Sequence, residues 1–406
     1  MDTVLIRDLV QRQEVEIKTG PFGTQLKASE YVDEGTPVLN VRNLGFSTVN
    51  KEKLEMVGDE TLERLSAHKL HTGDIVFGRK GAVERHAYIS DGENGWMQGS
   101  DCIRLRVKTE SINARYLSYY FLTPQHRSFM ISMCSHGTTM ASLNQKIIEM
   151  IAVPLPERKI QDQIVAVLKA LDEKAKNNRE INDNLQQQAQ AVFSDWLAKH
   201  IEDSNEVSLG EICSKITDGS HFSPKDDPTS TIPMLSVKDM GEFDFSFASC
   251  KHISENEYQK MIANDCVPQV NDILVAKDGS YLKEIFICNK ERQLAILSSI
   301  AIFRPDTSKI YPEILLAFLK SPRVLQEVRD NYVSGSALPR IVLKDFKKLC
   351  FLLPNLDAQG EISGLLTAIR HQIAEKESES NRLTQLRDLL LPKLMSGEID
   401  VSDIRL

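Results

Sequence analysis

The sequence lacks any long hydrophobic run. The apolar stretch at residues 147–153 is short and is interrupted by Glu149. A helix that spans a membrane needs about 18 or more consecutive apolar residues. The first residues, beginning Met1-Asp2-Thr3, have neither the basic segment nor the apolar segment of a secretory signal. We therefore expect a cytoplasmic protein.

Cysteine and histidine patterns that would define a framework or a metal site are also missing. The seven cysteines are an odd number and include no C-x-x-C pair, which argues against disulfides and against a zinc ribbon. We expect buried, reduced thiols. His68 and His71 lie three residues apart, but no cysteine or acidic residue completes a metal set around them. The nine histidines are expected to lie at the surface or to cap helices.

Catalytic motifs are absent as well. The methyltransferase pattern Asn/Asp-Pro-Pro-Tyr/Phe does not occur, and its nearest match, residues 227–230, lacks the second proline. There is no G-x-x-x-x-G-K-[ST] phosphate loop. Residues 305–309 (PDTSK) have the outline of a nuclease core but lack its second acidic residue, and we interpret them as a turn. The sequence therefore predicts a binding protein with no active site.

An overall excess of basic residues is missing too. The chain has 49 Lys and Arg against 57 Asp and Glu, which gives a net charge of −8. A nucleic-acid-binding domain usually carries basic clusters. Any contact with nucleic acid must therefore come from locally arranged Lys and Arg. The 406 residues, of which 41% are hydrophobic and 26% charged, are typical of a globular chain with two or three domains.

What the sequence does contain is an internal repeat. A shift of 198 positions places Gly81 over Gly279, Pro124 over Pro322 and Gln161 over Gln359. The same shift holds over more than 100 residues, which chance matches would not sustain. A chain with such self-similarity is built from copies of one structural unit.

Each copy has two parts. The first mixes short strands, turns and a few helices, with strands expected at residues 75–77 and 273–275 and helices at 114–122 and 312–319, each ending near a proline. The second part is a long helix, expected at residues 159–198 in the first copy. Its apolar residues recur every three or four positions, and it would be about 60 Å long. In the second copy the helix is expected to kink or end at Pro392.

A helix of this length with one apolar face needs a partner. The favoured partner is its copy, so that two pseudo-two-fold related units would lay their helices antiparallel as a coiled coil. The alternative is that each helix packs only on its own globular part. We therefore predict an α+β fold, with two mixed α/β domains separated by an antiparallel pair of long helices.

Several segments carry a resemblance to a known family. Residues 73–83 (GDIVFGRKGAV), 137–144 (GTTMASLN), 155–165 (LPERKIQDQIV) and 386–399 (LRDLLLPKLMSGEI) occur in an order that resembles the specificity subunit of type I restriction-modification enzymes. Any one of these motifs is weak, but the ordered set and the two-copy layout are specific. The second copy departs from the pattern at Lys277, where the first has Arg79, and at residues 353–359.

The resemblance implies a domain layout and assigns different functions to this chain and to its partner subunits. It implies target-recognition domains at residues 1–154 and 205–353, a central spacer helix at 155–204 and a C-terminal spacer helix at 354–406. Each recognition domain would read one half of a bipartite DNA site, and the helices would set the spacing. Two methyltransferase subunits would dock on the helices and bring motor-nuclease subunits with them. S-adenosylmethionine, ATP and Mg²⁺ would belong to those partners.

We expect the DNA contacts to come from loops that present hydroxyl, amide and basic groups. In the first copy the candidates are Lys18, Thr19, Gly20, Phe22, Gly23, Lys27, Arg79, Lys80, Arg85, His136, Thr138 and Thr139. In the second copy they are Thr217, Asp218, Ser220, His221, Lys277, Tyr281, Lys283, Ser334, Ser336 and Arg340. The alternative is that the glycines in these loops only make turns.

Two other functions remain open at this stage. The chain could be a small methyltransferase or nuclease that uses the same reader domains, which methylation of DNA by the purified chain alone would support. It could also be a coiled-coil scaffold that does not bind DNA, which the paired mixed α/β parts argue against.

Overall fold

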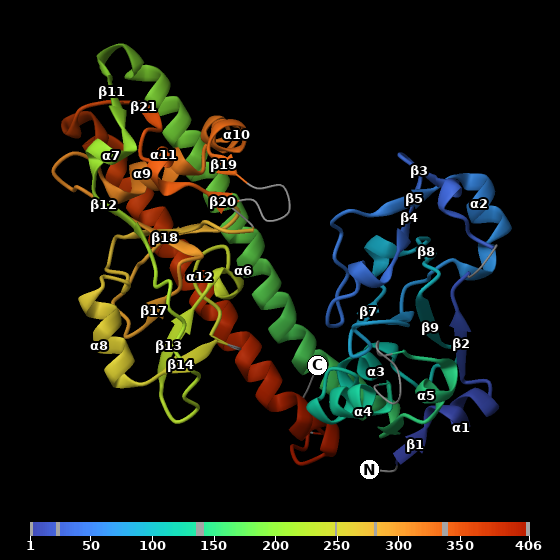
Figure 1. Ribbon diagram of the computed structural model, residues 1–406. Coiled ribbons are helices and arrows are strands. Elements are labelled where there is room, and N and C mark those ends of the chain that lie inside the picture. Colours follow the sequence, from blue (N-terminus) through green and yellow to red (C-terminus); the bar gives the residue numbers. More distant parts are fainter. Residues whose placement is uncertain are drawn as a thin grey trace. The chain divides into compact units, whose positions relative to one another are not determined.

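The computed structural model describes residues 3–21, 25–134, 142–247, 250–279, 282–334 and 340–402. The chain divides into two compact units (Figure 1). Unit 1 comprises Met1–Glu173 and Leu383–Leu406, and unit 2 comprises Lys174–Arg382. The division passes through both long helices.

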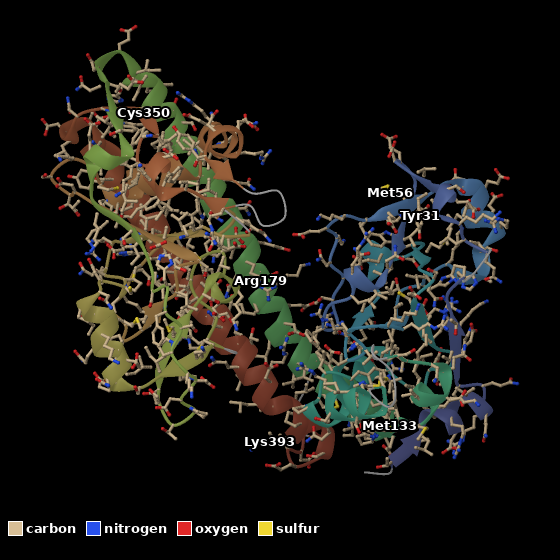
Figure 2. The ribbon with its side chains drawn as sticks, viewed as in Figure 1. Tyr31, Met56, Met133, Arg179, Cys350 and Lys393 are labelled. Atoms are coloured by element: carbon tan, nitrogen blue, oxygen red, sulfur yellow. The ribbon has the colours of Figure 1, made fainter. Side chains whose placement is uncertain are left out.

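Unit 1 is built around a four-stranded antiparallel sheet. Its strands are ordered β2 (Val15–Thr19), β9 (Cys102–Val107), β6 (Ile75–Gly78) and β7 (His86–Tyr88). A second sheet has the order β3 (Tyr31–Val32), β5 (Glu55–Val57), β4 (Thr36–Leu39) and β8 (Met97–Gln98), and Figure 2 labels Tyr31 and Met56 on it. β1 (Thr3–Leu5) pairs with β10 (Ala152–Pro154). The helices are α1 (Ile6–Gln11), α2 (Asp59–Arg64), α3 (Ala114–Tyr120), α4 (Pro124–Cys134) and α5 (Gln145–Glu149).

Unit 2 repeats this plan. Its main sheet has the order β12 (Cys213–Asp218), β18 (Ile300–Pro305), β15 (Ile273–Ala276) and β16 (Ile285–Ile287). The second sheet has the order β14 (Lys251–Ile253), β13 (Ile232–Leu235) and β17 (Ala295–Ile296), and β11 (Asn205–Ser208) pairs with β21 (Cys350–Leu353). A short ladder joins β19 (Val333–Ser334) to β20 (Arg340–Ile341). The helices are α7 (Leu209–Ile212), α8 (Glu255–Ala263), α9 (Pro312–Leu319), α10 (Pro322–Asn331) and α11 (Leu343–Phe346).

The two main sheets are bounded by the turns that the sequence predicts. Gly73 and Asn271, two residues before β6 and β15, have φ values of +92° and +73°. Gly81 and Gly279, after the same strands, have φ values of +77° and +75°. Glycine and asparagine adopt this left-handed conformation at the lowest steric cost. The strands expected at 75–77 and 273–275 are confirmed.

A glutamine at the start of each long helix makes the same three hydrogen bonds in both copies. The Gln161 side-chain oxygen accepts from the Asn113 N–H at 2.8 Å, and its amide donates to the carbonyls of Ser111 and Pro156. The Gln359 oxygen accepts from the Tyr311 N–H at 3.1 Å, and its amide donates to the carbonyls of Lys309 and Pro354. The two copies therefore share individual side-chain hydrogen bonds as well as their order of strands and helices.

The long helices are α6 (Arg158–Lys199), with 42 residues, and α12 (Leu356–Ser396), with 41. In unit 1, Arg387 Nη1 donates to Asp172 Oδ1 at 2.8 Å. In unit 2, Asn182 Nδ2 donates to the Ile373 carbonyl at 3.2 Å, and Trp196 Nε1 donates to the Ala358 carbonyl at 3.1 Å. Later residues of α6 thus meet earlier residues of α12, so the two helices run antiparallel within these contacts.

The helices also belong to the globular cores. In unit 1 the core around the main sheet includes Ile164 and Leu168 of α6 with Leu391 and Leu394 of α12. In unit 2 it includes Phe193 and Trp196 with Ile362 and Leu366. Each helix therefore packs on the globular parts and also contacts the other helix, so packing on a globular part alone does not describe either helix.

Two expectations about proline need correction. α12 does not end at Pro392 but continues to Ser396, because Leu394 and Met395 beyond it are buried in the unit 1 core. Pro124 and Pro322 do not only end the helices before them. They are the first residues of α4 and α10, where the missing proline N–H is not needed.

The expectation of surface or capping histidines is wrong for three of them. His86 is fully buried, and His126 and His68 are 3% and 8% exposed. The rings of His86 and His126 lie 5.8 and 4.7 Å from the Phe121 ring. Their aromatic neighbours, far apart in the sequence, take them into the core. All seven cysteines are free thiols; four are buried, and three, including Cys350 (Figure 2), are half-buried.

Candidate nucleic-acid interface

In unit 1 several of the predicted contact residues lie at the end of strand β2. Lys18 and Thr19 close this strand, and the Gly20 N–H then donates to the Cys102 carbonyl at 2.9 Å. A side chain at Gly20 could not be accommodated, because its Cβ would lie 1.9 Å from the Gly99 carbonyl oxygen. The glycine is thus required by the close approach of the Gly99 backbone.

The segment after β6 reaches the same edge of the sheet. The Arg79 N–H donates to the Asp101 carbonyl and the Leu143 N–H donates to the Arg79 carbonyl, both at 2.8 Å. Lys80 forms a β-bridge with Ser142. Gln145 Nε2 donates to Thr19 Oγ1 at 3.0 Å, which ties the start of α5 to the end of β2. The structure therefore brings Thr19, Gly20, Arg79 and Lys80 together.

Unit 2 builds the same edge. The Gly219 N–H donates to the Ile300 carbonyl at 3.0 Å, the counterpart of the Gly20 bond. The Lys277 N–H donates to the Ser299 carbonyl at 2.9 Å, and the Ile341 N–H donates to the Lys277 carbonyl at 3.0 Å. Asp278 forms a β-bridge with Arg340, as Lys80 does with Ser142. Thr217, Asp218, Ser220, Lys277 and Arg340 are thereby brought together.

The two edges differ in their charges. Lys277 is buried, and its ammonium pairs with the Asp218 carboxylate. The exposed imidazole of His221 lies 3.3 Å from the other oxygen of Asp218. In unit 1, the exposed Lys80 ammonium lies 3.7 Å from Asp101. The Lys277 ammonium therefore forms a buried ion pair within unit 2, whereas the Lys80 ammonium is exposed at the surface of unit 1.

Other predicted residues lie apart or outside the described residues. Two candidates contact residues near them in the sequence: the Lys27 N–H donates to Glu30 Oε2 at 2.7 Å, and the Lys283 ammonium lies 3.8 Å from Glu284. Arg340 Nε donates to Asp278 Oδ1 at 3.0 Å. Phe22, Gly23, His136, Thr138, Thr139, Tyr281 and Ser336 lie outside the described residues, and for Ser334 only the backbone pairing with Arg340 is described.

Arg85 belongs to a surface cluster with Phe46 and Arg127 that the sequence did not predict. Its guanidinium lies 5.6 Å from the centre of the Phe46 ring, and that of Arg127 lies 4.6 Å from the same ring. Phe46 is 41% exposed. An exposed aromatic ring between two guanidinium groups can stack on a nucleic-acid base or contact the backbone. No local pattern would have joined Phe46 to Arg127.

A second missed feature is an exposed aromatic residue in unit 2. Phe222 is 63% exposed. Its N–H donates to Ser220 Oγ at 3.1 Å, and that hydroxyl donates to the Phe222 carbonyl at 2.8 Å. These bonds fix the backbone that presents the ring beside His221. The serine and histidine were predicted as contacts, and the phenylalanine next to them was not.

No described helix is both long enough and apolar enough to cross a membrane. Among the same residues, no three His, Cys, Asp or Glu side chains gather in a way that could hold a metal ion.

Each copy of the repeat matches the model of a known domain family. A family model described as "Type I restriction modification DNA specificity domain" matches residues 22–187 and again residues 201–385. The chain is 22% identical over 320 residues to the type I restriction enzyme MjaIX specificity subunit of Methanocaldococcus jannaschii, covering 73% of this chain and 72% of the relative. It is 19% identical over 402 residues to the HindI specificity subunit of Haemophilus influenzae, covering 80% and 86%.

A solved structure shares the fold. The crystal structure of the type I restriction-modification S subunit from M. genitalium matches with a TM-score of 0.53 and 15% identity, covering 97% of this chain and 96% of that one. The chain belongs to the family of type I restriction-modification specificity subunits and has two DNA specificity domains.

Proposed function

We propose that this chain is the sequence-specific DNA-binding subunit of a type I restriction-modification complex, and that each recognition domain reads one half of a bipartite DNA site. The observation that carries the proposal is the double match to the DNA specificity domain, one match on each copy of the repeat. In both copies the same backbone hydrogen bonds gather the candidate residues at one edge of the main sheet. Basic and hydroxyl groups there would hold phosphates and read base edges.

The two readers would recognise different half-sites. In unit 1 the bridge after β6 is made by Lys80 and Ser142, and in unit 2 by Asp278 and Arg340. Asp278 stands at the position of Lys80, so unit 2 carries a carboxylate where unit 1 carries an exposed ammonium. Because base specificity depends on which donors and acceptors reach the groove, two edges with different donors would select different bases.

The long helices would act as a coiled-coil strut that sets the distance between the half-sites and docks two methyltransferase subunits. Support comes from the antiparallel contacts between α6 and α12 and from apolar side chains left exposed on α12. Leu386 and Leu389 are 45% and 67% exposed in unit 1, and Leu365 is 50% exposed in unit 2. Exposed apolar residues on a helix are typical of a surface that a partner covers.

The chemistry would belong to the partners. Methylation with S-adenosylmethionine would be carried out by the methyltransferase subunits, and ATP- and Mg²⁺-dependent translocation and cleavage by motor-nuclease subunits that join through them. This chain would contribute recognition and spacing, and the complex would act in the cytoplasm.

The test is an exchange of residues 1–153 for the reader of another specificity subunit, followed by methylome sequencing of a host that expresses the complex. One half of the methylated motif should change and the other half should stay the same. A motif altered in both halves would contradict independent reading. A complex that methylates DNA without sequence preference would contradict the proposed function itself.

A further inference from the structure

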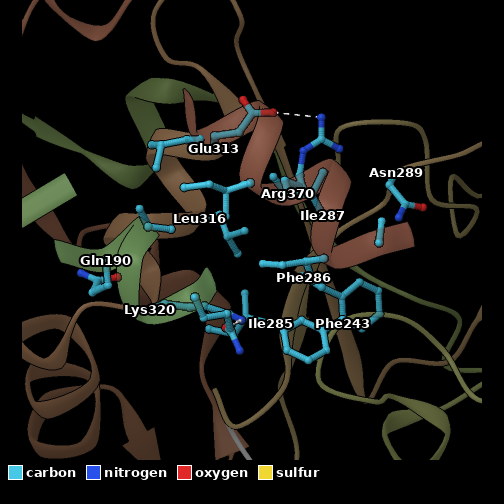
Figure 3. A pocket seen from close by; sticks show the side chains of 17 residues that line it. Gln190, Phe243, Ile285, Phe286, Ile287, Asn289, Glu313, Leu316, Lys320 and Arg370 are labelled. Carbon is cyan, nitrogen blue, oxygen red and sulfur yellow. Dashed lines mark hydrogen bonds and ion pairs between the residues drawn. The ribbon is translucent and has the colours of Figure 1, made fainter. Parts of the chain in front are cut away.

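Unit 2 contains an apolar pocket between its globular part and the two long helices (Figure 3). Its walls come from β16, α9, α6 and α12, and include Phe286, Leu316, Ile369 and Ile373. Phe243 closes one side. The empty space between its walls is about 690 Å³, a volume that counts the open solvent at the mouth as well as the enclosed part.

The corresponding place in unit 1 is filled by side chains. The 198-residue shift puts Tyr119 at the position of Ala317, and Arg387 at the position of Ala189. The Tyr119 hydroxyl donates to Asp172 Oδ2 at 2.7 Å, and Arg387 Nη1 donates to Asp172 Oδ1 at 2.8 Å. The pocket of unit 2 therefore exists where two large side chains are replaced by alanine.

A third replacement enlarges the same space. Tyr88 pairs with Ile75 in unit 1, and Ile287 pairs with Ile273 in unit 2, so Ile287 stands at the position of Tyr88. In unit 1 the Arg115 guanidinium lies 4.6 Å from the Tyr88 ring and 4.8 Å from the Tyr119 ring. Two aromatic rings thus occupy in unit 1 the volume that is open in unit 2.

The polar groups around this space are retained with their charges reversed. Arg115 lies 3.8 Å from Asp172 in unit 1. At the corresponding positions of unit 2, Glu313 lies 3.0 Å from Arg370, and Figure 3 shows this pair at the pocket. Both members of the unit 2 pair are largely buried. The ion pair is thus common to both units, and in unit 2 it forms one polar part of the pocket wall.

Further polar groups in the wall offer donors. Lys320 Nζ donates to Gln186 Oε1 at 2.6 Å, and within the described residues no carboxylate lies within 4.0 Å of it. Burial lowers the pKa of Lys320 to about 8, so its amine is still mostly charged at neutral pH. Gln190 Nε2 and Arg370 Nε are buried donors without a hydrogen-bond acceptor among the described atoms. A buried donor without an acceptor is costly, and a ligand acceptor would remove the cost.

We propose that the pocket of unit 2 binds a small molecule that carries an aromatic ring and one carboxylate. The ring would take the space that Tyr119 and Tyr88 fill in unit 1, against Phe243 and Phe286. The carboxylate would accept from Lys320, and Gln190 lies in the same wall. A charge-assisted hydrogen bond to a buried ammonium is stronger than one between neutral groups. The proposal does not depend on DNA binding.

The test is isothermal titration calorimetry of phenylacetate into the full chain, with benzyl alcohol and acetate as the ligands that lack the charge and the ring. Phenylacetate should bind more tightly than either. Ala317→Tyr should abolish binding because it restores the ring of unit 1. Ala198→Tyr changes an exposed alanine of α6 that does not line the pocket, and it should leave binding unchanged.

A second variant tests the role of the charge. Lys320→Met keeps the packing and removes the ammonium, so phenylacetate should bind about tenfold more weakly while benzyl alcohol is unaffected. Equal binding of phenylacetate to the Ala317→Tyr chain, or no heat with the unaltered chain at millimolar phenylacetate, would overturn the proposal. Displacement of bound phenylacetate by added methyltransferase subunits would also overturn it, because the pocket would then be a partner's docking site.

Discussion

Asp272 and Arg304 form a two-bond ion pair that joins the start of β15 to the end of β18, with Nε–Oδ1 and Nη2–Oδ2 distances of 2.8 and 2.9 Å. Asp74 and Arg106 form the same pair in unit 1, with both distances at 2.6 Å. Both aspartate side chains are 1% exposed. The hydrogen bonds to Asp272 raise the pKa of Arg304. The aspartates of the repeated Gly-Asp and Asn-Asp turns thus hold the strand that leads to the candidate interface.

Asp272→Asn should destabilise unit 2 by about 2 kcal/mol, because it leaves the partly buried Arg304 with only the more distant Asp265 carboxylate, 3.5 Å away. Chemical denaturation followed by circular dichroism would measure the free energy of unfolding. Asp272→Leu combined with Arg304→Met should recover much of the loss. Glu180→Gln, which removes an exposed pair with Lys176, should change stability by less than about 0.5 kcal/mol. A loss in Asp272→Asn no larger than this control would contradict the assignment.

Stability should fall as the solution is acidified below pH 6.5. Burial lowers the pKa of His86 and of His126 from 6.5 to about 3. Between pH 6.5 and 3 the unfolded chain binds protons at these positions that the folded chain does not, so protons favour unfolding. Each histidine would contribute up to about 1.4 kcal/mol per pH unit. The free energy of unfolding, measured from pH 7.5 down to pH 5, would give the slope.

A matched variant checks this assignment. His126→Phe replaces a buried ring beside Phe121 with one that does not titrate, so the slope below pH 6.5 should become shallower. Equal slopes for the unaltered chain and His126→Phe would show that other groups control the acid response.

Two buried asparagines should hold the register of the helix pair. Asn178 and Asn182 are fully buried, and Asn178 Nδ2 donates to Glu379 Oε2 at 2.9 Å. A buried polar residue in a helix seam selects one register at some cost in stability. Asn178→Leu with Asn182→Leu should therefore raise the melting temperature and produce additional species in size-exclusion chromatography. Gln188→Leu, at an exposed position of α6, should do neither; a single species with unchanged melting in the double variant would refute the idea.

Lys80 should contribute a phosphate contact. Lys80→Ala would weaken DNA binding by the assembled complex on all sequences alike and reduce the slope of log affinity against log salt by about one. Fluorescence anisotropy over a series of NaCl concentrations would measure this slope. Lys176→Ala removes an exposed lysine from α6 and should not change it. If both variants gave the same slope, Lys80 would lie away from the phosphates.

Much of the fold could be predicted because periodicity and repetition are local properties of the sequence. The helix expected at residues 159–198 is α6 (Arg158–Lys199), and the helix expected at 312–319 is α9 with the same bounds. The sheet order could not be obtained in this way. β2 pairs with β9, and Val15 faces Val107 across 92 positions of sequence. No short-range pattern specifies such pairings.

The candidate site, like the fold, could be predicted from the sequence only in part. Glycine and lysine at turns identified Gly20, Lys80 and Lys277 as loop residues. The inward orientation of Lys277 toward Asp218 and the stacking of Arg127 on Phe46 depend on tertiary contacts, so they could not be predicted. The contacts with DNA stay a prediction for every one of these residues.

The charge reversal between Arg115–Asp172 and Glu313–Arg370 bears on how such a chain can exchange its readers. Copying residues 205–353 into the place of the first reader would bring a glutamate to position 115, opposite Asp172. Two carboxylates would then face each other in a half-buried site. A graft that extends through the counterpart of Asp172 would bring Arg370 together with the glutamate, and it would need alanine in place of Arg387, because Ala189 is the counterpart of Arg387 in unit 2. The join that recombination or an engineer should choose therefore lies within α6, beyond the end of the reader itself.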